Sequence, residues 1–152
     1  MPILSKRPWL LAIILCLLLP LCGCNSPPNT VQVTKVIDGD TIVIEGNFRV
    51  RYIGIDTPEI YPQLEAYGIE AWQANRQLVE GKRVRLERDV SETDKHDRLL
   101  CYVYVDSIFV NAELVSEGLA WAKAYPPDTK YQDYLKEMET EAKRAGRGMW
   151  AK

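Results

Sequence analysis

The stretch RYIGIDTPE at residues 51–59 joins two kinds of sequence that rarely belong to one strand. It begins with the apolar pattern of a buried strand and ends in the polar run DTPE. A buried strand requires neither an arginine at its start nor two carboxylates at its end. Thr57 with Pro58 and Glu59 also fits a helix start, with threonine as the cap and an acid in the first turn.

Arg51 and Asp56 bracket this strand, yet residues five apart face opposite sides of a regular strand. Glycine is the residue expected where a strand breaks, because its backbone is less restricted than that of other residues. Either Gly54 marks a bulge or the strand ends near Ile55, and the sequence leaves both possibilities open.

Outward from this stretch, the chain contains strands first and helices last. Alternating apolar residues predict strands over 31–37, 41–45, 47–55, 83–87, 99–105 and 108–110. Helical spacing predicts helices over 63–80, over 111–118 and from 128 or 129 to 145. Asn111 is expected to cap the second helix, and Asp128 or Thr129 the third. This order predicts an α+β domain on a small closed barrel, although strand number alone does not define the barrel type.

Composition limits the possible functions. The chain has 152 residues, of which 47% are apolar and 26% charged, so it can form one domain with a substantial core. The formal net charge of −2 excludes a generally basic coat for nucleic acid. Any binding of phosphate must therefore depend on a few well-placed arginines.

The first 24 residues have the features of a secretory signal. Lys6 and Arg7 precede the apolar run WLLAIILCLLLPL, which is too short to span a bilayer comfortably. The following LCGC resembles the lipobox of bacterial lipoproteins, which implies that Cys24 is lipidated and becomes the first residue of the mature chain. An uncleaved membrane anchor is the alternative, although Pro20 and Gly23 interrupt the run.

This interpretation divides the chain into a signal peptide at 1–23, a lipidated cysteine with a short tether at 24–30, and one domain at 31–152. We expect an exported protein, anchored by lipid to the membrane of the cell envelope and facing the periplasm or the exterior. Cys101 is then the one cysteine left in the domain, where it is expected to be a small buried residue.

The polar clusters each have a structural interpretation. The run DGDT at 38–41 is a good hairpin turn, and Asp94 with Arg98 could form an exposed ion pair worth about 0–1 kcal/mol. Hydrolysis of a phosphodiester, however, requires oxygen ligands for a hard cation, guanidinium groups for the phosphate and a carboxylate for the attacking water. These groups are present at predicted strand ends and in adjoining loops: Asp40, Asp56, Arg51, Arg98 and Glu59.

Together these motifs resemble the thermonuclease (staphylococcal-nuclease-like) family. The matching segments follow one another in order over nearly all of the predicted domain: DGDT at 38–41, R-x4-DTPE at 51–59, YGIEA at 67–71, DKHDR at 94–98, VNAELVSEGLA at 110–120 and GMW at 148–150. The resemblance implies an α+β fold with a five-stranded OB-fold barrel and three helices. It also implies cleavage of DNA and RNA with little sequence specificity, leaving 3′-phosphate ends.

The resemblance also implies roles for single residues. Asp40, Asp56 and the backbone carbonyl of Thr57 match the ligands of Ca²⁺. Arg51 and Arg98 match the arginines that contact the phosphate and stabilise the transition state. Glu59 matches a glutamate that acts as the general base or orients the attacking water.

The substrate-binding residues depart from the family pattern. Lys95, His96 and Tyr125 are the expected substrate contacts, and Tyr125 would stack on a base for about 1–3 kcal/mol. Packing of Tyr125 against the last helix is the alternative. His96 and Asp97 replace an aromatic residue and a glycine of the family. A carboxylate at Asp97 would repel phosphate or pair with Arg98, so we expect weaker binding without loss of activity.

Two other functions are compatible with this fold. One is a noncatalytic OB-fold module that binds nucleic acid, and the other is a lipid-anchored envelope protein serving adhesion or assembly. Loss of Lys6 and Arg7 with the signal would leave 17 basic against 21 acidic residues, which is unfavourable for a pure binder. The complete set of acids and arginines favours the nuclease, and we expect it to be a monomer.

Overall fold

The computed structural model describes residues 29–151. The predicted signal peptide, the lipidated Cys24 and the tether as far as residue 28 lie outside the described residues. Within residues 29–151, no helix is both long and apolar enough to cross a bilayer. The first strand begins at Thr30, the last residue of the predicted tether.

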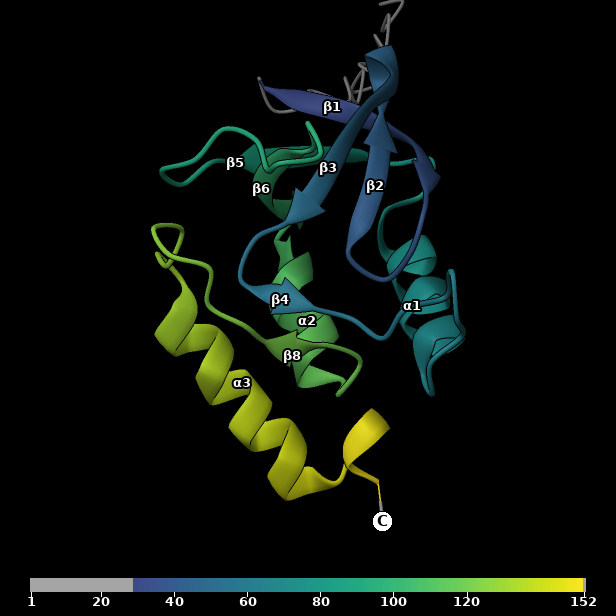
Figure 1. Ribbon diagram of the computed structural model, residues 1–152, viewed down its shortest axis with the longest axis vertical. Coiled ribbons are helices and arrows are strands. Elements are labelled where there is room, and N and C mark those ends of the chain that lie inside the picture. Colours follow the sequence, from purple (N-terminus) through teal and green to yellow (C-terminus); the bar gives the residue numbers. More distant parts are fainter. Residues whose placement is uncertain (1–28, 152) are drawn as a thin grey trace, which may run out of the picture.

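Five strands form a closed barrel (Figure 1). They are β1 (Thr30–Val36), β2 (Thr41–Ile44), β3 (Phe48–Tyr52), β5 (Arg83–Glu87) and β6 (Leu99–Val105). Neighbours in the order β3-β2-β1-β5-β6 pair antiparallel, and a parallel pairing of β3 with β6 closes the ring. This connectivity is that of an OB-fold, so the predicted fold is confirmed. The short β7 (Ile108–Phe109) extends β6 as a hairpin.

Side-chain alternation explains what fills the barrel. In β3, Val50 and Tyr52 are buried, whereas Arg49 and Arg51 lie on the other face. Cys101 in β6 is also buried, as predicted, and this burial raises the pKa of its thiol to about 11. Strand β3 thus presents two arginines outward from a wall of the core.

Three helices lie beside and below the barrel in Figure 1: α1 (Gly68–Val79), α2 (Val110–Ser116) and α3 (Gln132–Ala145). The 3-10 turns η1 (Glu45–Asn47) and η2 (Gly148–Trp150) complete the elements, with a small sheet of β4 (Ile55–Asp56) and β8 (Trp121–Ala122). Helix α1 begins at Gly68 and not at the predicted residue 63, and residues 57–67 form a loop. The interpretation of Thr57 as a helix start is therefore wrong.

Asn111, Asp128 and Thr129 do not cap the second and third helices as predicted, because Phe109 and Tyr131 occupy the N-cap positions of α2 and α3. Asn111 is buried, accepting a hydrogen bond from the Val103 amide at 3.0 Å and donating one to the Ile53 carbonyl at 2.8 Å. Asp128 accepts hydrogen bonds from the amides of Val90 at 3.0 Å and Ser91 at 2.8 Å. Each side chain ties a distant loop or strand to the barrel and caps no helix.

The break in the quoted stretch is a strand end. Strand β3 ends at Tyr52, and Gly54 has a left-handed backbone with φ of +78°. A Cβ atom at Gly54 would lie 2.6 Å from Cδ1 of Leu135 on α3. After this turn, β4 leaves the barrel and pairs with β8, and Asp56 lies 2.9 Å from Arg51.

Candidate active site

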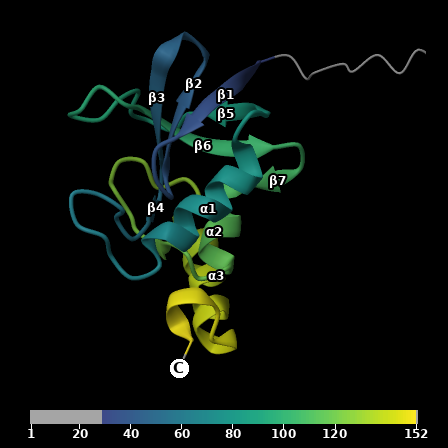
Figure 2. The same ribbon diagram turned by 90° about the vertical axis from the view of Figure 1, so that its right-hand side faces the viewer.

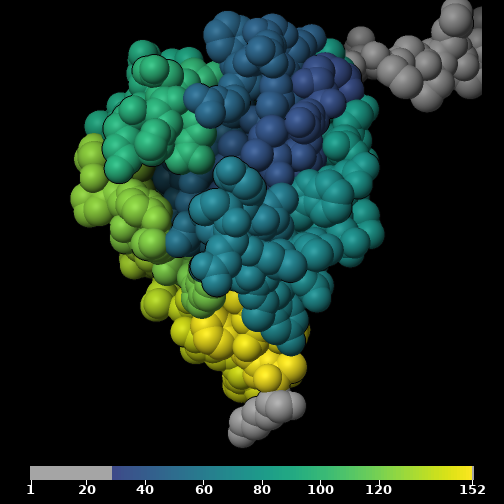
Figure 3. All heavy atoms as spheres, turned by 45° about the vertical axis from the view of Figure 1, so that its right-hand side comes forward, coloured from purple at the N-terminus to yellow at the C-terminus, as the bar shows by residue number. Residues whose placement is uncertain are grey.

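Three loops gather on one side of the molecule, at the left in Figure 2: residues 57–67 after β4, residues 88–98 after β5 and residues 123–131 after β8. A pocket of about 400 Å³ lies between the loop after β5, the loop after β8 and the end of β3. Its polar lining residues include Arg51, Asp94, Lys95, His96, Arg98 and Tyr125. Figure 3 shows a hollow between the loop after β5, the β2–β3 hairpin and the loop after β4.

Arg51 forms the centre of the site. One terminal nitrogen of its guanidinium lies 2.7 Å from Oδ2 of Asp40, and the other lies 2.9 Å from Oδ1 of Asp56. The Arg51 side chain is only 12% exposed. The strand end at Gly54 makes this possible, because Asp56 returns to the face of β3 that carries Arg51. The structure therefore brings together these three residues that the sequence singled out.

Asp40 is the most perturbed acid of the site. Burial raises its pKa to about 7, and the Arg51 charge opposes that rise. Its Oδ2 accepts a hydrogen bond from the Thr57 amide at 3.0 Å, and Oδ1 accepts one from the Thr41 hydroxyl at 3.2 Å. A Cβ atom at Gly39 would lie 2.6 Å from Oγ1 of Thr57, so the DGDT turn can approach this loop only with glycine there.

The predicted metal ligands supply the right kind of atom for a hard cation. Asp40 and Asp56 are carboxylates near one guanidinium, and Thr57 is buried beside Asp40. A buried carboxylate whose charged form is disfavoured gains from a second positive charge. This donor set fits a divalent cation, although residues 29–151 contain no cluster of three or more acidic, histidine or cysteine side chains placed to hold one.

Arg98 is held by Asp94. Nε and one terminal nitrogen of Arg98 lie 2.8 and 2.7 Å from Oδ2 of Asp94, and its other terminal nitrogen lies 3.4 Å from the Thr41 hydroxyl. The expected exposed ion pair is in fact three-quarters or more buried, with Arg98 24% and Asp94 18% exposed. Sequence reasoning missed Asp94 as a positioning residue, although its spacing of four from Arg98 was visible.

Glu59 lies on the loop after β4 and lines a second, more open pocket with Arg49, His96, Asp97 and Arg98. Partial burial raises the pKa of Glu59, and the charges of Asp38 and Asp56 raise it further. Arg98 lines both pockets. Arg98 therefore shares one pocket with Arg51 and the other with Glu59.

The family model described as "Staphylococcal nuclease homologue" matches residues 49–152. The chain belongs to the staphylococcal nuclease family. It is 36% identical over 133 residues to the thermonuclease of Staphylococcus hyicus, covering 84% of this chain and 79% of that protein. It is 40% identical over 124 residues to the thermonuclease of Staphylococcus intermedius, covering 78% of this chain and 74% of that protein.

A third relative of this chain is an uncharacterised endonuclease of Haemophilus influenzae. The two are 35% identical over 151 residues, which cover 96% of this chain and 80% of that protein. The similarity thus extends beyond the barrel and includes the loops that carry the site.

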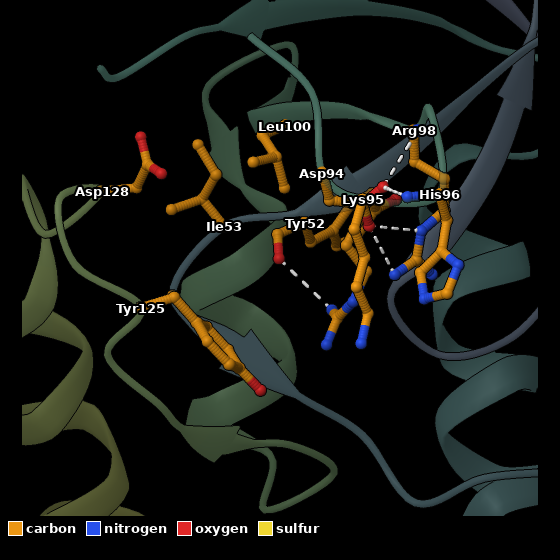
Figure 4. Close-up of a pocket in the computed structure, with 11 residues that line it drawn as sticks. Tyr52, Ile53, Asp94, Lys95, His96, Arg98, Leu100, Tyr125 and Asp128 are labelled. Atoms are coloured by element: carbon orange, nitrogen blue, oxygen red, sulfur yellow. Dashed lines mark hydrogen bonds and ion pairs between the residues drawn. The ribbon is translucent and has the colours of Figure 1, made fainter. Parts of the chain in front are cut away.

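The predicted substrate contacts of this family member line the first pocket. Figure 4 shows Tyr125 and Lys95 on opposite sides of it. Tyr125 is 44% exposed and faces the pocket, so the alternative of packing against α3 is not what the structure shows. His96 lines both pockets, and its carbonyl accepts a hydrogen bond from Arg49 at 2.9 Å.

Of the two effects expected of Asp97, pairing with Arg98 is not observed, and repulsion of phosphate stays a prediction. Its backbone has φ of +57°, a conformation that glycine adopts easily and that aspartate tolerates better than most residues. Arg98 pairs with Asp94 and not with Asp97. The replacement of the family glycine therefore preserves the turn, and it places a carboxylate in the second pocket beside Glu59.

Lys123 also belongs to the site, although the sequence did not predict it. Its Nζ atom lies 2.8 Å from Oδ2 of Asp56, and its half-exposed side chain spans the β4–β8 sheet. No local signal reveals this contact, because 67 residues separate the two in the chain.

Proposed function

We propose that the chain is a nuclease that hydrolyses phosphodiester bonds of DNA or RNA with little sequence specificity. The observation that carries this proposal is the arrangement of Arg51 between two carboxylates, with Arg98 lining one pocket with Arg51 and a second pocket with Glu59. A protein that only binds nucleic acid gains nothing from burying carboxylates where the phosphate would lie. The relatives named thermonuclease and endonuclease support the same function.

The arginines and Glu59 have separate parts in the proposed reaction. Arg51 and Arg98 contact the phosphate oxygens, on which negative charge grows as water attacks phosphorus. Glu59 accepts a proton from that water, and its raised pKa makes it a better base than an ordinary glutamate. The new bond is between water oxygen and phosphorus, and the bond from phosphorus to the 5′-oxygen breaks. The leaving oxygen takes a proton from solvent, which leaves a 3′-phosphate and a 5′-hydroxyl.

Calcium is the proposed cofactor, held by Asp40, Asp56 and the Thr57 carbonyl. When bound, it would offset the charge of the phosphate that enters the site. Two carboxylates are few for this ion, so we expect a dissociation constant of about 10⁻⁴–10⁻³ M, the range of extracellular sites. Arg51 has to share or release its two carboxylates for the ion to bind.

For location, the proposal is an exported monomer whose signal peptide at 1–23 is removed and whose Cys24 carries lipid. The basic and apolar N-terminal pattern and the LCGC ending support it. Residues 24–30 would then hold the domain at 31–152 close to the envelope membrane. Digestion of nucleic acid at the cell envelope is the role that this location favours.

The test uses the full chain in a nonionic detergent, with single-stranded DNA and RNA at millimolar calcium and an EGTA control. We expect calcium-dependent cleavage, and products that a polymerase extends only after phosphatase removes the 3′-phosphate. Glu59→Gln should lower kcat steeply, while Glu70→Gln, an exposed acid on α1, should leave it unchanged.

Arg98→Ala separates an enzyme from a binder. Loss of a transition-state arginine costs about 10³–10⁵ in the rate of phosphoryl transfer, whereas a pure binder would lose only affinity. Binding without cleavage under every metal tried would overturn the nuclease proposal and support the noncatalytic OB-fold module.

A further inference from the structure

The backbone around Lys123 is held by hydrogen bonds to β4 and to α3. Strand β8 just before it pairs with β4, with Asp56 opposite Trp121, and the Lys123 amide donates a hydrogen bond to the Gly54 carbonyl at 2.9 Å. The β8 backbone is also held by α3, because the Ala122 amide donates to the Glu139 carboxylate at 3.3 Å. The backbone of Lys123 therefore has little freedom, and its side chain starts beside Asp56.

Both oxygens of Asp56 are occupied by cationic side chains. Arg51 takes Oδ1 at 2.9 Å, and Lys123 takes Oδ2 at 2.8 Å. A cation that binds Asp56 has to compete with both of them. Their mobility differs, because Arg51 is 12% exposed and Lys123 is 51% exposed.

Lys123 is the easier of the two to displace. Arg51 also pairs with Asp40 and contacts the carbonyl of Tyr52 at 3.3 Å, so its guanidinium has several partners. Within residues 29–151, the Lys123 ammonium pairs with one carboxylate, that of Asp56. The same ammonium lies 5.4 Å from the centre of the Tyr125 ring, at the end of a flexible side chain. The face of the Tyr125 ring is therefore within reach of this ammonium and can attract it when Asp56 is taken by another cation.

We propose that Lys123 is the exchangeable counter-ion of Asp56. It neutralises this carboxylate when the site lacks calcium, and it leaves when calcium binds. Because the two cations compete for Asp56, Lys123 weakens calcium binding and raises the calcium concentration at which the site fills. The inference rests on the proposed function, because that proposal makes Asp56 a calcium ligand.

The test measures calcium affinity without substrate, by isothermal titration calorimetry of the full chain in a nonionic detergent. Exposed ion pairs are worth about 0.2–1 kcal/mol, so Lys123→Gln should tighten calcium binding by about 1.4- to fivefold. Lys123→Arg keeps the charge and should bind calcium as weakly as the unmodified chain. The gain in Lys123→Gln should shrink as added salt screens the interaction.

Lys130→Gln is the matched control. Lys130 is also 51% exposed and its Nζ lies 2.6 Å from Oε1 of Glu87, but this pair is not part of either pocket of the site. The calcium affinity of the Lys130→Gln variant should equal that of the unmodified chain. If Lys123→Gln binds calcium no more tightly than Lys130→Gln does, the role of Lys123 is wrong.

A further variant separates this inference from the calcium site itself. Asp56→Asn should weaken calcium binding strongly, whatever Lys123 does. If the unmodified chain takes up no calcium, or if Asp56→Asn binds it equally well, the calcium assignment of the proposed function is wrong and this inference is wrong with it. Cleavage measured separately would then show whether the nuclease works with another ion.

Discussion

Asp94 arranges the segment that carries Arg98. Its Oδ1 accepts hydrogen bonds from the amides of His96 at 2.9 Å and Arg98 at 3.0 Å. Its Oδ2 accepts a hydrogen bond from Nε of Arg98. Burial raises the pKa of Asp94, but the hydrogen bonds from Arg98 and His96 outweigh it, so the net pKa is lowered. The carboxylate is therefore charged at neutral pH and fixes both the loop and the guanidinium.

We expect Asp94→Asn to lower kcat roughly ten- to hundredfold, because a misplaced catalytic group costs about that much. The change should be smaller than that of Arg98→Ala, and KM should change less than kcat. Steady-state kinetics on single-stranded DNA at saturating calcium measure it. Asp106→Asn, in the exposed β6–β7 turn, is the control. An unchanged kcat in Asp94→Asn would show that Arg98 orients itself without this partner.

The break between β3 and β4 joins the barrel to the site. Gly54 provides the left-handed turn, and Asn111 holds the preceding Ile53 through its carbonyl. The β4–β8 pair then supports both Asp56 and Lys123. The position of these charged groups thus depends on one turn that has no polar residue of its own.

Gly54→Ala should destabilise the fold by more than the left-handed backbone alone explains. Gly81 offers the comparison, because it has φ of +72° with nothing within 4 Å of a Cβ atom. Gly81→Ala should cost about 1–2 kcal/mol of backbone strain. Gly54→Ala should cost about 1–3 kcal/mol more, because its methyl group meets Leu135. Urea unfolding measures both, and equal losses would mean that α3 moves aside freely.

Glu139 fastens α3 to β8. Burial raises its pKa, but hydrogen bonds from Lys136 at 2.7 Å and Lys143 at 3.0 Å outweigh it, so the pKa is lowered from 4.5. Its ionised form therefore contributes stability that is present above about pH 4.5 and is lost as pH falls through the lower folded pKa.

Glu139→Gln should lower the free energy of unfolding by about 1–3 kcal/mol at neutral pH, since a charged hydrogen-bond acceptor is lost. The difference from the unmodified chain should shrink in acid, because the stability that the ionised form provides is lost as pH falls toward the lowered folded pKa. Urea titrations near pH 7 and pH 3 measure it. Glu137→Gln, an exposed acid on the same helix, should change neither value. A loss that is the same at both pH values would show that charge is not the cause.

Local patterns predicted most strands but not the ends of the first helix. Strands 83–87 and 99–105 agree with β5 and β6 to the residue. The first alternates charged and apolar residues, and the second is an apolar run rich in valine and tyrosine. Helix α1 starts later than its apolar pattern predicts, because Glu59 and Glu65 hold the preceding loop. The Glu65 amide donates a hydrogen bond to the Glu59 carbonyl, and the Glu59 amide donates one to the Glu65 carboxylate, each at 2.9 Å. Such a closure depends on tertiary context and leaves no periodic pattern.

The site shows the same limit. The acids and arginines could be singled out from their chemistry and order, because the DTPE and DKHDR segments lie at strand ends. Lys123 could not, since its contact with Asp56 exists only where β8 pairs with β4. Asn111 looked like a cap because its two partners lie in other elements.

At the scale of the whole molecule, the chain is slightly acidic, with a formal charge of −2, although its proposed substrate is a polyanion. The cations that face the phosphate in the first pocket are few: Arg51, Lys95 and Arg98. Long-range attraction therefore contributes little, and binding depends on these local contacts.

We expect a shallow salt dependence of kcat/KM on single-stranded DNA. About three phosphate contacts predict a slope of roughly −2 in log kcat/KM against log salt, at saturating calcium. Lys95→Gln should reduce the slope by about 0.7, because one contact is lost. A slope steeper than about −5 would show a larger basic surface than the first pocket provides.

The parallel pairing of β3 with β6 has a consequence for the living cell. Strand β6 is made about fifty residues after β3, and Arg51 and Arg98 reach one pocket only when the two strands join. Pairings between distant segments form late, after the loops between them close. A chain still emerging from the ribosome therefore has Arg51 and Arg98 in separate places. Under the proposed function, a newly made chain would not cleave the messenger RNA or the genome of its own cell until the pairing of β3 with β6 closes the barrel.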